Sequence, residues 1–156
     1  MRSLQSGFTL LELLIAGMIL AVLAAIAVPS YQNHVLRSNR ALAQGMLSDL
    51  SLKQEARALH QGRYATDLSI LLGSDNSNTT HFFSNRRGQI SKTLNGNGSS
   101  IYKIELLDPS AISFTLRATA VGRQENDMDC KTFTLTSVGQ RTAAAFNGAD
   151  SPRCWK

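Results

Sequence analysis

Hydrophobic residues are concentrated in one run near the start of the chain. Between Phe8 and Val28, a stretch of 21 residues, only Thr9, Glu12 and Gly17 interrupt the apolar sequence. A helix rises about 1.5 Å per residue, so a helix of this length would span the roughly 30 Å hydrocarbon core of a bilayer. The run therefore predicts a membrane-spanning helix that carries a single charge, Glu12, near its beginning.

The helical pattern continues beyond this run in an amphipathic form. From Ser30 to about Leu59, apolar residues recur mostly at spacings of four or seven, which keeps them on one face of a helix. The stripe consists of Tyr31, Val35, Leu42, Met46 and Leu50, widened by Leu36 and Leu47. The polar segment His60-Gln61-Gly62 ends the pattern. We therefore predict one helix of about 50 residues, apolar all round in its first half and one-sided in its second.

After Ser100 the hydrophobic period changes from helical to two. Alternating segments at 101–107 and 112–120, followed by Phe133 and Leu135, predict three or four antiparallel strands. Residues 61–99 look irregular. A long helix followed by a meander with one polar face predicts an α+β fold, in which the helix packs on an antiparallel sheet.

Composition and charge narrow the class of protein. The 156 residues suit one domain, and 43% hydrophobic content is ordinary, but this average combines one very apolar part with a polar remainder. A simple soluble enzyme is therefore a poor fit. The histidines His34, His60 and His81 are scattered, and no nucleophile elbow or phosphate-binding loop is present. We expect no catalytic residue and no cofactor.

Acidic residues near the C-terminus raise the question of a metal. Glu125, Asp127, Asp129 and Asp150 could in principle bind calcium, but their order does not follow a calcium-binding loop. We interpret residues 125–129 as a solvated acidic turn and expect no metal.

Three interpretations compete for the N-terminal run. A removable secretory signal would be cut after Ala25-Ile26-Ala27, but Glu12 at the start of the apolar core and Pro29 just after the cut argue against it. A plain uncleaved anchor fits the length. The third interpretation depends on the short basic segment that precedes Phe8.

The segment Gly7-Phe8-Thr9-Leu10-Leu11-Glu12-Leu13, followed by the apolar stretch and Ala27-Val28-Pro29-Ser30-Tyr31, resembles the N-terminus of type IV pilins. The resemblance implies that a prepilin peptidase cuts between Gly7 and Phe8, removes residues 1–7 and methylates the new N-terminal Phe8. It also implies that residues 8–29 form a transmembrane helix that later enters a filament core. Residues 30–156 would then form a periplasmic globular domain with the type IV pilin fold.

Two residues of the run acquire roles from this resemblance. An ionised carboxylate in a membrane costs roughly 2.5–3.5 kcal/mol on insertion scales, so Glu12 implies a partner. In pilins the corresponding residue is thought to neutralise the N-terminal amine, here that of Phe8, on a neighbouring subunit. A location of Glu12 at the wet membrane interface remains the open alternative. Pro29 removes a helical N–H group and predicts a kink.

The C-terminus supports the same family. Cys130 and Cys154 lie 24 positions apart, and two cysteines in an exported chain suggest one disulfide. The resemblance implies that this pair bounds the C-terminal D-region of a pilin. Segments 127–130, 135–141 and 154–156 resemble minor pilins of the PilE type, as does segment 30–40.

The resemblance implies a structural subunit of a type IV pilus, and specifically a minor pilin. Such a subunit would prime pilus assembly at or near the tip and support adhesion and twitching motility. Its partners would be other major and minor pilins, the prepilin peptidase and the inner-membrane assembly machinery. It would sit in the inner membrane before assembly and in the extracellular pilus afterwards.

Alternative functions remain open: a major pilin, a pseudopilin of a type II secretion system, or a pilin-type DNA-uptake component. Without Arg2 the mature chain has 15 basic and 11 acidic residues, and its net charge of +4 is spread along the sequence. The pair Arg86-Arg87 could form a small basic patch, but we interpret it as ordinary solvated charge. The charge pattern by itself does not favour nucleic acid as a partner.

Overall fold

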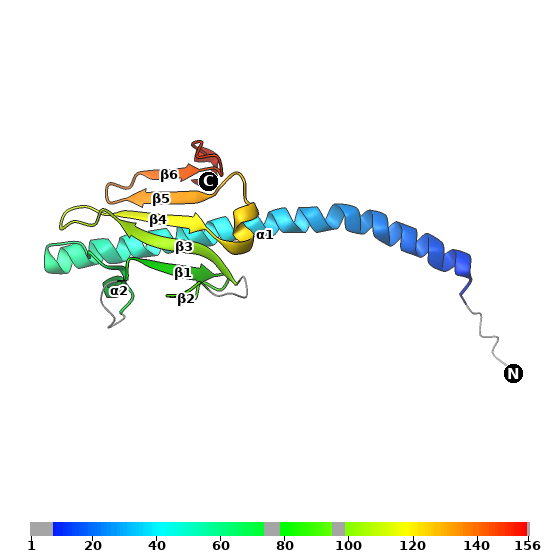
Figure 1. Cartoon of the computed structure of the whole chain (residues 1–156), viewed down its shortest axis with the longest axis horizontal. Helices are drawn as coiled ribbons and strands as arrows, with labels where there is room; N and C mark the ends of the chain where they lie inside the picture. The colour runs from blue at the N-terminus through cyan, green and yellow to red at the C-terminus, as the bar shows by residue number, and fades with distance from the viewer. Residues whose placement is uncertain (1–7, 74–78, 95–98, 156) are drawn as a thin grey trace. The chain divides into compact units, whose positions relative to one another are not determined.

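The computed structural model describes residues 8–73, 79–94 and 99–155 (Figure 1). The predicted leader, residues 1–7, lies outside the described residues. The chain divides into two compact units, Met1–Val35 and Leu36–Lys156, and helix α1 (Leu10–Gln61) contributes to both. The remaining elements are α2 (Leu68–Leu71), β1 (His81–Asn85), β2 (Ile90–Ser91), β3 (Ser100–Leu107), β4 (Thr115–Ala120), η1 (Gly122–Asn126), β5 (Thr132–Thr136), β6 (Arg141–Ala144) and η2 (Pro152–Trp155).

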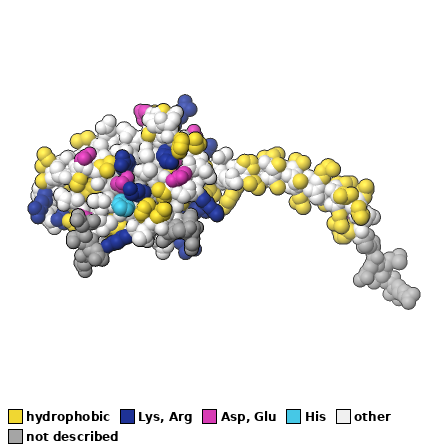
Figure 2. Space-filling model, in the orientation of Figure 1, with side chains coloured by type: hydrophobic (Ala, Val, Ile, Leu, Met, Phe, Trp, Pro, Cys, Tyr) yellow, Lys and Arg dark blue, Asp and Glu magenta, His cyan; other side chains and the backbone are white. Residues whose placement is uncertain are grey.

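The first unit contains the apolar half of α1. Thr9 caps the helix, because its Oγ1 accepts a hydrogen bond from the Glu12 backbone N–H at 3.2 Å. Hydrophobic side chains are exposed along this half (Figure 2). Within the described residues, α1 is the helix that is long and apolar enough to cross a membrane. Pro29 lies inside α1, which continues beyond it, and the kink stays a prediction.

The second unit is a six-stranded antiparallel sheet packed on the second half of α1 (Figure 1). The strand order is β2-β1-β3-β4-β5-β6. Strands β1, β3, β4, β5 and β6 are therefore neighbours in their order along the chain, and β2 pairs with the other edge of β1. The largest fully buried apolar side chains come from all parts of this unit: Leu47, Leu68, Ile101, Tyr102, Ile104, Phe114, Leu116 and Phe133. The predicted α+β fold, with the helix on the sheet, is confirmed.

The buried face of α1 differs from the predicted stripe. Leu47 and Leu50 are buried as expected, but the other buried positions of α1 are Asn39, Ala43 and Gln54. The two polar residues are buried because each makes a specific hydrogen bond. The Asn39 amide donates to Gln124 Oε1 at 2.7 Å, and Gln54 exchanges two hydrogen bonds with the backbone of Ala65. An apolar pattern cannot reveal such positions.

Two details of the strand prediction are wrong. Residues 61–99 contain α2, β1 and β2, so the described sheet has six strands rather than three or four. The sequence pattern did not predict strand β1, because one of its two buried residues is Ser84, which breaks the apolar alternation. Ile112 was predicted to begin the alternating strand segment 112–120, but β4 begins only at Thr115 and Ile112 is 85% exposed.

Candidate functional site

The N-terminal residues singled out by the sequence lie together at the start of α1. Phe8 directly precedes the cap residue Thr9, and Glu12 is exposed in the first helical turn. Glu12 also holds the third helical position of a Thr-x-x-Glu sequence, which is typical of a capping box, and the structure shows one bond of that motif, from the Glu12 backbone N–H to Thr9 Oγ1. A carboxylate near a helix N-terminus is favourable in its own right. Glu12 therefore has a local structural role as well as the predicted role in assembly.

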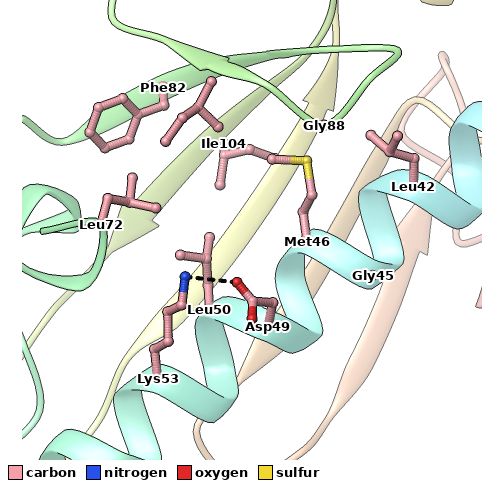
Figure 3. Close-up of a pocket in the computed structure, with 11 residues that line it drawn as sticks. Leu42, Gly45, Met46, Asp49, Leu50, Lys53, Leu72, Phe82, Gly88 and Ile104 are labelled. Carbon is pink, nitrogen blue, oxygen red and sulfur yellow. Dashed lines mark ion pairs between the residues drawn. The ribbon is translucent and has the colours of Figure 1, made fainter.

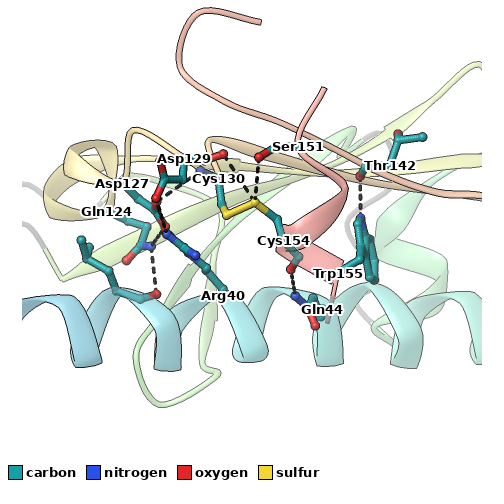
Figure 4. Close-up of a disulfide and its surroundings, with 11 residues drawn as sticks. Arg40, Gln44, Gln124, Asp127, Asp129, Cys130, Thr142, Ser151, Cys154 and Trp155 are labelled. Carbon is teal, nitrogen blue, oxygen red and sulfur yellow. Dashed lines mark hydrogen bonds and ion pairs between the residues drawn. A yellow bond between two sulfur atoms is a disulfide. The ribbon is translucent and has the colours of Figure 1, made fainter. Parts of the chain in front are cut away.

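Asp127 is the centre of a buried polar cluster that joins α1 to the C-terminal part of the chain (Figure 4). Arg40 donates from Nε and Nη2 to the two Asp127 oxygens, both at 2.6 Å. Gln124 Nε2 and the Cys130 backbone N–H donate to the same carboxylate at 3.1 and 3.2 Å. The carboxylate raises the pKa of the Arg40 guanidinium, although partial burial of Arg40 acts in the opposite direction.

This cluster shows that the interpretation as a solvated turn is wrong for Asp127, whereas Glu125 and Asp129 are exposed as expected. The Asp127 side chain is 1% exposed, and a carboxylate buried to that extent requires a charged or hydrogen-bonding partner. Arg40 supplies the charge from a position 87 residues earlier in the sequence. Among the described residues, no group of three His, Cys, Asp or Glu side chains could hold a metal ion.

The predicted disulfide between Cys130 and Cys154 is confirmed (Figure 4). The segment after β6 is fixed at further points. Gln44 on α1 donates to the Cys154 carbonyl, and Trp155 Nε1 donates to the Thr142 carbonyl at 2.6 Å. The Ser151 N–H also bonds to the Ala143 carbonyl on β6. The C-terminal segment therefore covers the outer edge of β6, which protects the sheet from unwanted strand pairing.

The turn between β1 and β2 presents Arg86 and Arg87 to solvent. The Gly88 N–H bonds to the Asn85 carbonyl at 3.0 Å, and the Asn85 N–H bonds to the Gln89 carbonyl at 3.0 Å. Gly88 has a φ of +74°, the left-handed conformation that glycine adopts without strain. This is a three-residue hairpin loop, a β-turn followed by one left-handed residue. The two central positions of the β-turn, residues 86 and 87, are the arginines.

Three cations of this hairpin, Arg86, Arg87 and Lys92, are all exposed, and we call them the basic edge. Among the described residues, none of the three forms an ion pair. Other exposed cations, such as Arg63 and Arg153, form none either, so the distinguishing feature of the basic edge is that its three cations lie close together in the sequence. The basic edge is thus a local concentration of positive charge, within seven residues, that no carboxylate in the described part of the chain neutralises.

Comparison with known proteins identifies the family. The family described as "Prokaryotic N-terminal methylation motif" matches residues 2–28. The family described as "Type IV minor pilin ComP, DNA uptake sequence receptor" matches residues 29–134, more than half of the chain. The chain belongs to the type IV minor pilin family. The predicted minor pilin is confirmed, and DNA uptake, which the sequence left as an alternative, gains support.

Individual relatives of this pilin are similar mainly over one short segment. A type IV major fimbrial protein FimA of Dichelobacter nodosus is 60% identical over 38 residues, 24% of each chain. A second FimA and a fimbrial protein of the same organism are each 42% identical over 53 residues, 34% of this chain and 33% of theirs. The matched region therefore spans only about a quarter to a third of these relatives. Such pilins are structural proteins that assemble with other pilins, and the apolar α1 agrees with membrane anchoring before assembly.

A cavity of about 390 Å³ lies between α1 and the β1–β2 hairpin of the pilin (Figure 3). Its apolar lining comes from Leu42, Met46, Leu50, Leu72, Phe82, Ile90 and Ile104. The Asp49–Lys53 ion pair, at 2.9 Å, and the glycines Gly45 and Gly88 complete the lining. The lining contains no histidine, cysteine or hydroxyl nucleophile, so the cavity does not resemble an active site.

The sheet carries a small charged group around Glu105 on β3. Lys103 Nζ lies 2.8 Å and Arg117 Nη2 lies 3.3 Å from the Glu105 carboxylate. Partial burial raises the pKa of Glu105, but the two cations outweigh this effect and leave the pKa below its ordinary value. The folded state therefore favours the ionised carboxylate.

This shift predicts a contribution of Glu105 to acid stability. Because the folded pKa lies below the unfolded value of about 4.3, the contribution is present above that pH and is lost as pH falls through the folded pKa. We expect wild type to lose up to about 1 kcal/mol more stability than Glu105→Gln between about pH 6 and pH 3. Urea unfolding at a series of pH values measures the difference, and parallel pH profiles for the two proteins would contradict it.

Proposed function

We propose that this pilin is a minor subunit of a type IV pilus that binds DNA for uptake, and that the basic edge contacts the DNA. The observation that carries the proposal is the match to a DNA uptake sequence receptor family over residues 29–134, which contains Arg86, Arg87 and Lys92. The sequence analysis considered Arg86 and Arg87 as a small basic patch but favoured ordinary solvated charge, because charge counts do not reveal which cations lack partners.

The chemistry of the basic edge suits a phosphate backbone. Arginine presents a planar fork of donors that matches phosphate oxygens, and each neutralised phosphate releases condensed counterions. Arg86 and Arg87 have no carboxylate partner among the described residues. No ion pair with a described residue has to break before they bind DNA. The ordered turn also keeps both side chains at adjacent positions on an exposed tip.

We also propose how the chain matures before it enters the filament. The prepilin peptidase would cut between Gly7 and Phe8 and methylate Phe8, and Pro29 would kink the helix. Residues 8–29 would hold the chain in the inner membrane, with residues 30–156 in the periplasm, until the assembly machinery draws it into the filament. There Glu12 would neutralise the amine of a neighbouring pilin. The bond from the Glu12 backbone N–H to the cap residue supports the proximity of Glu12 to the N-terminus of the helix.

Priming of assembly at the pilus tip, with effects on adhesion and twitching motility, is the second role expected from the sequence. A deletion strain separates the two roles. If DNA reception is the main role, the strain keeps its pili but loses DNA uptake, whereas a priming subunit leaves the strain without pili. A defect confined to protein secretion would instead indicate a pseudopilin.

The direct test of the proposal uses the full-length chain in detergent and a fluorescent DNA duplex. We expect the double variant Arg86→Gln/Arg87→Gln to bind the duplex at least about tenfold more weakly than wild type, because two charge-assisted contacts are lost. The matched control Arg63→Gln/Arg153→Gln removes the same charge from two other exposed positions and should bind nearly as wild type does.

Fluorescence anisotropy gives the dissociation constants. Equal weakening in both double variants would show that only overall charge matters. A wild-type chain that does not bind DNA would contradict the proposed function itself.

A further inference from the structure

Asn85 makes an unusually complete set of hydrogen bonds around the turn of the basic edge. Its Oδ1 accepts from the backbone N–H of Arg87 at 2.9 Å and from that of Gln89 at 3.0 Å. Its Nδ2 donates to Gln89 Oε1 at 2.9 Å. Together with the two backbone bonds to Gly88 and Gln89, one residue fixes the middle and the end of the turn.

The same type of turn forms at residues 145–149 with a smaller set of side-chain hydrogen bonds, since only the Ala149 N–H makes such a bond there, to Asn147 Oδ1, among the described residues. Residues 145–149 make the same two backbone hydrogen bonds, Gly148 N–H to Ala145 O and Ala145 N–H to Ala149 O, with a left-handed Gly148. The position equivalent to Asn85 is there an alanine. The bond from the Arg87 N–H to Asn85 Oδ1 has no counterpart among the described residues of that turn. This bond is therefore not needed to close the hairpin, and it adds order to the turn that carries the two arginines.

From this contrast we infer that Asn85 is a positioning residue of the DNA site: it holds the backbone of Arg86 and Arg87 in one arrangement before DNA arrives. This inference rests on the proposed function. A loop that is already ordered loses less conformational entropy on binding, so the same arginine contacts give a higher affinity. Asn85 would act through the two arginines and would not itself need to touch DNA.

A double-mutant cycle in the full-length chain tests the inference, because residues that act through one another have non-additive effects. We expect Asn85→Ala to weaken binding to the duplex about threefold to tenfold in the wild-type background. In the Arg86→Gln/Arg87→Gln background the same substitution should have no further effect. Asn85→Ser should recover part of the affinity, since a serine hydroxyl can accept a similar local hydrogen bond.

The control variant is Asn147→Ala, which removes a side-chain acceptor, the bond from the Ala149 N–H, from the equivalent turn elsewhere. It should bind the duplex as wild type does. Urea unfolding should give the same midpoint for every variant of this set, including Asn85→Ala combined with the two arginine substitutions. Equal midpoints show that the fold is intact in each variant.

The outcomes separate this inference from the proposed function. A wild-type chain that does not bind the duplex contradicts both. If wild type binds and Asn85→Ala binds equally well, or if its loss is the same in both arginine backgrounds, the positioning role is overturned and the proposed function stands.

Discussion

Replacing Arg40 by methionine is expected to lower the free energy of unfolding by about 3–5 kcal/mol, because breaking a buried ion pair leaves an uncompensated charge. The charge left behind would be that of Asp127, which is almost completely buried and receives both arginine hydrogen bonds. Methionine keeps a long apolar side chain at position 40, so the loss reports mainly on the charge. The chain has a single tryptophan, Trp155, whose fluorescence can follow urea unfolding of the C-terminal segment.

A matched control separates burial from charge. Lys53→Met breaks the Asp49–Lys53 pair on the same helix, where both side chains are substantially exposed. Exposed pairs of this spacing contribute only about 0.3–0.5 kcal/mol, so little destabilisation is expected. If Arg40→Met costs no more than Lys53→Met, the cluster around Asp127 does not stabilise the attachment of α1 to the disulfide region.

Replacing Glu12 by glutamine is expected to leave processing intact but to reduce incorporation into pili at least about tenfold, since an unneutralised amine would enter an apolar helix core. Mass analysis of the N-terminus should still find methylated Phe8. Immunoblots of sheared filaments measure incorporation. Normal levels of the Glu12→Gln subunit in filaments would refute the role of this carboxylate in assembly.

Thr9→Ala is the control for this second prediction. It removes the cap that accepts the Glu12 N–H, at a local cost of about 0.5–2 kcal/mol, but keeps the carboxylate. We expect Thr9→Ala subunits to enter filaments nearly as well as wild type. An equal loss in both variants would mean that helix initiation, rather than charge neutralisation, limits assembly.

The features predicted correctly from the sequence depend on local patterns. The long helix follows from continuous periodicity, and its end at Gln61 follows from Gly62, whose φ of +71° suits glycine. The disulfide follows from there being only two cysteines in the chain. Strand β1 was missed because Ser84, a small polar residue, occupies a fully buried position on its inner face.

The missed features depend on contacts between residues distant in the sequence. Nothing near Asp127 indicates that Arg40 will neutralise it, so an acidic turn was the reasonable interpretation of the sequence. The basic edge was not favoured because the lack of a carboxylate partner, like the presence of one at Asp127, cannot be seen in the sequence. The spacing of Asn85 and Gly88 is typical of a tight turn, so the turn itself could be predicted from the sequence. Whether Arg86 and Arg87 have carboxylate partners depends on the folded chain.

The central claim, that this minor pilin holds DNA by the basic edge, is tested most directly by the salt dependence of duplex binding. Each phosphate contact contributes about 0.9 to the slope of log K against log salt concentration. We expect binding by wild type to weaken steeply with salt, and the slope for Arg86→Gln/Arg87→Gln to be shallower by about two units. Identical slopes for the two proteins would contradict the claim.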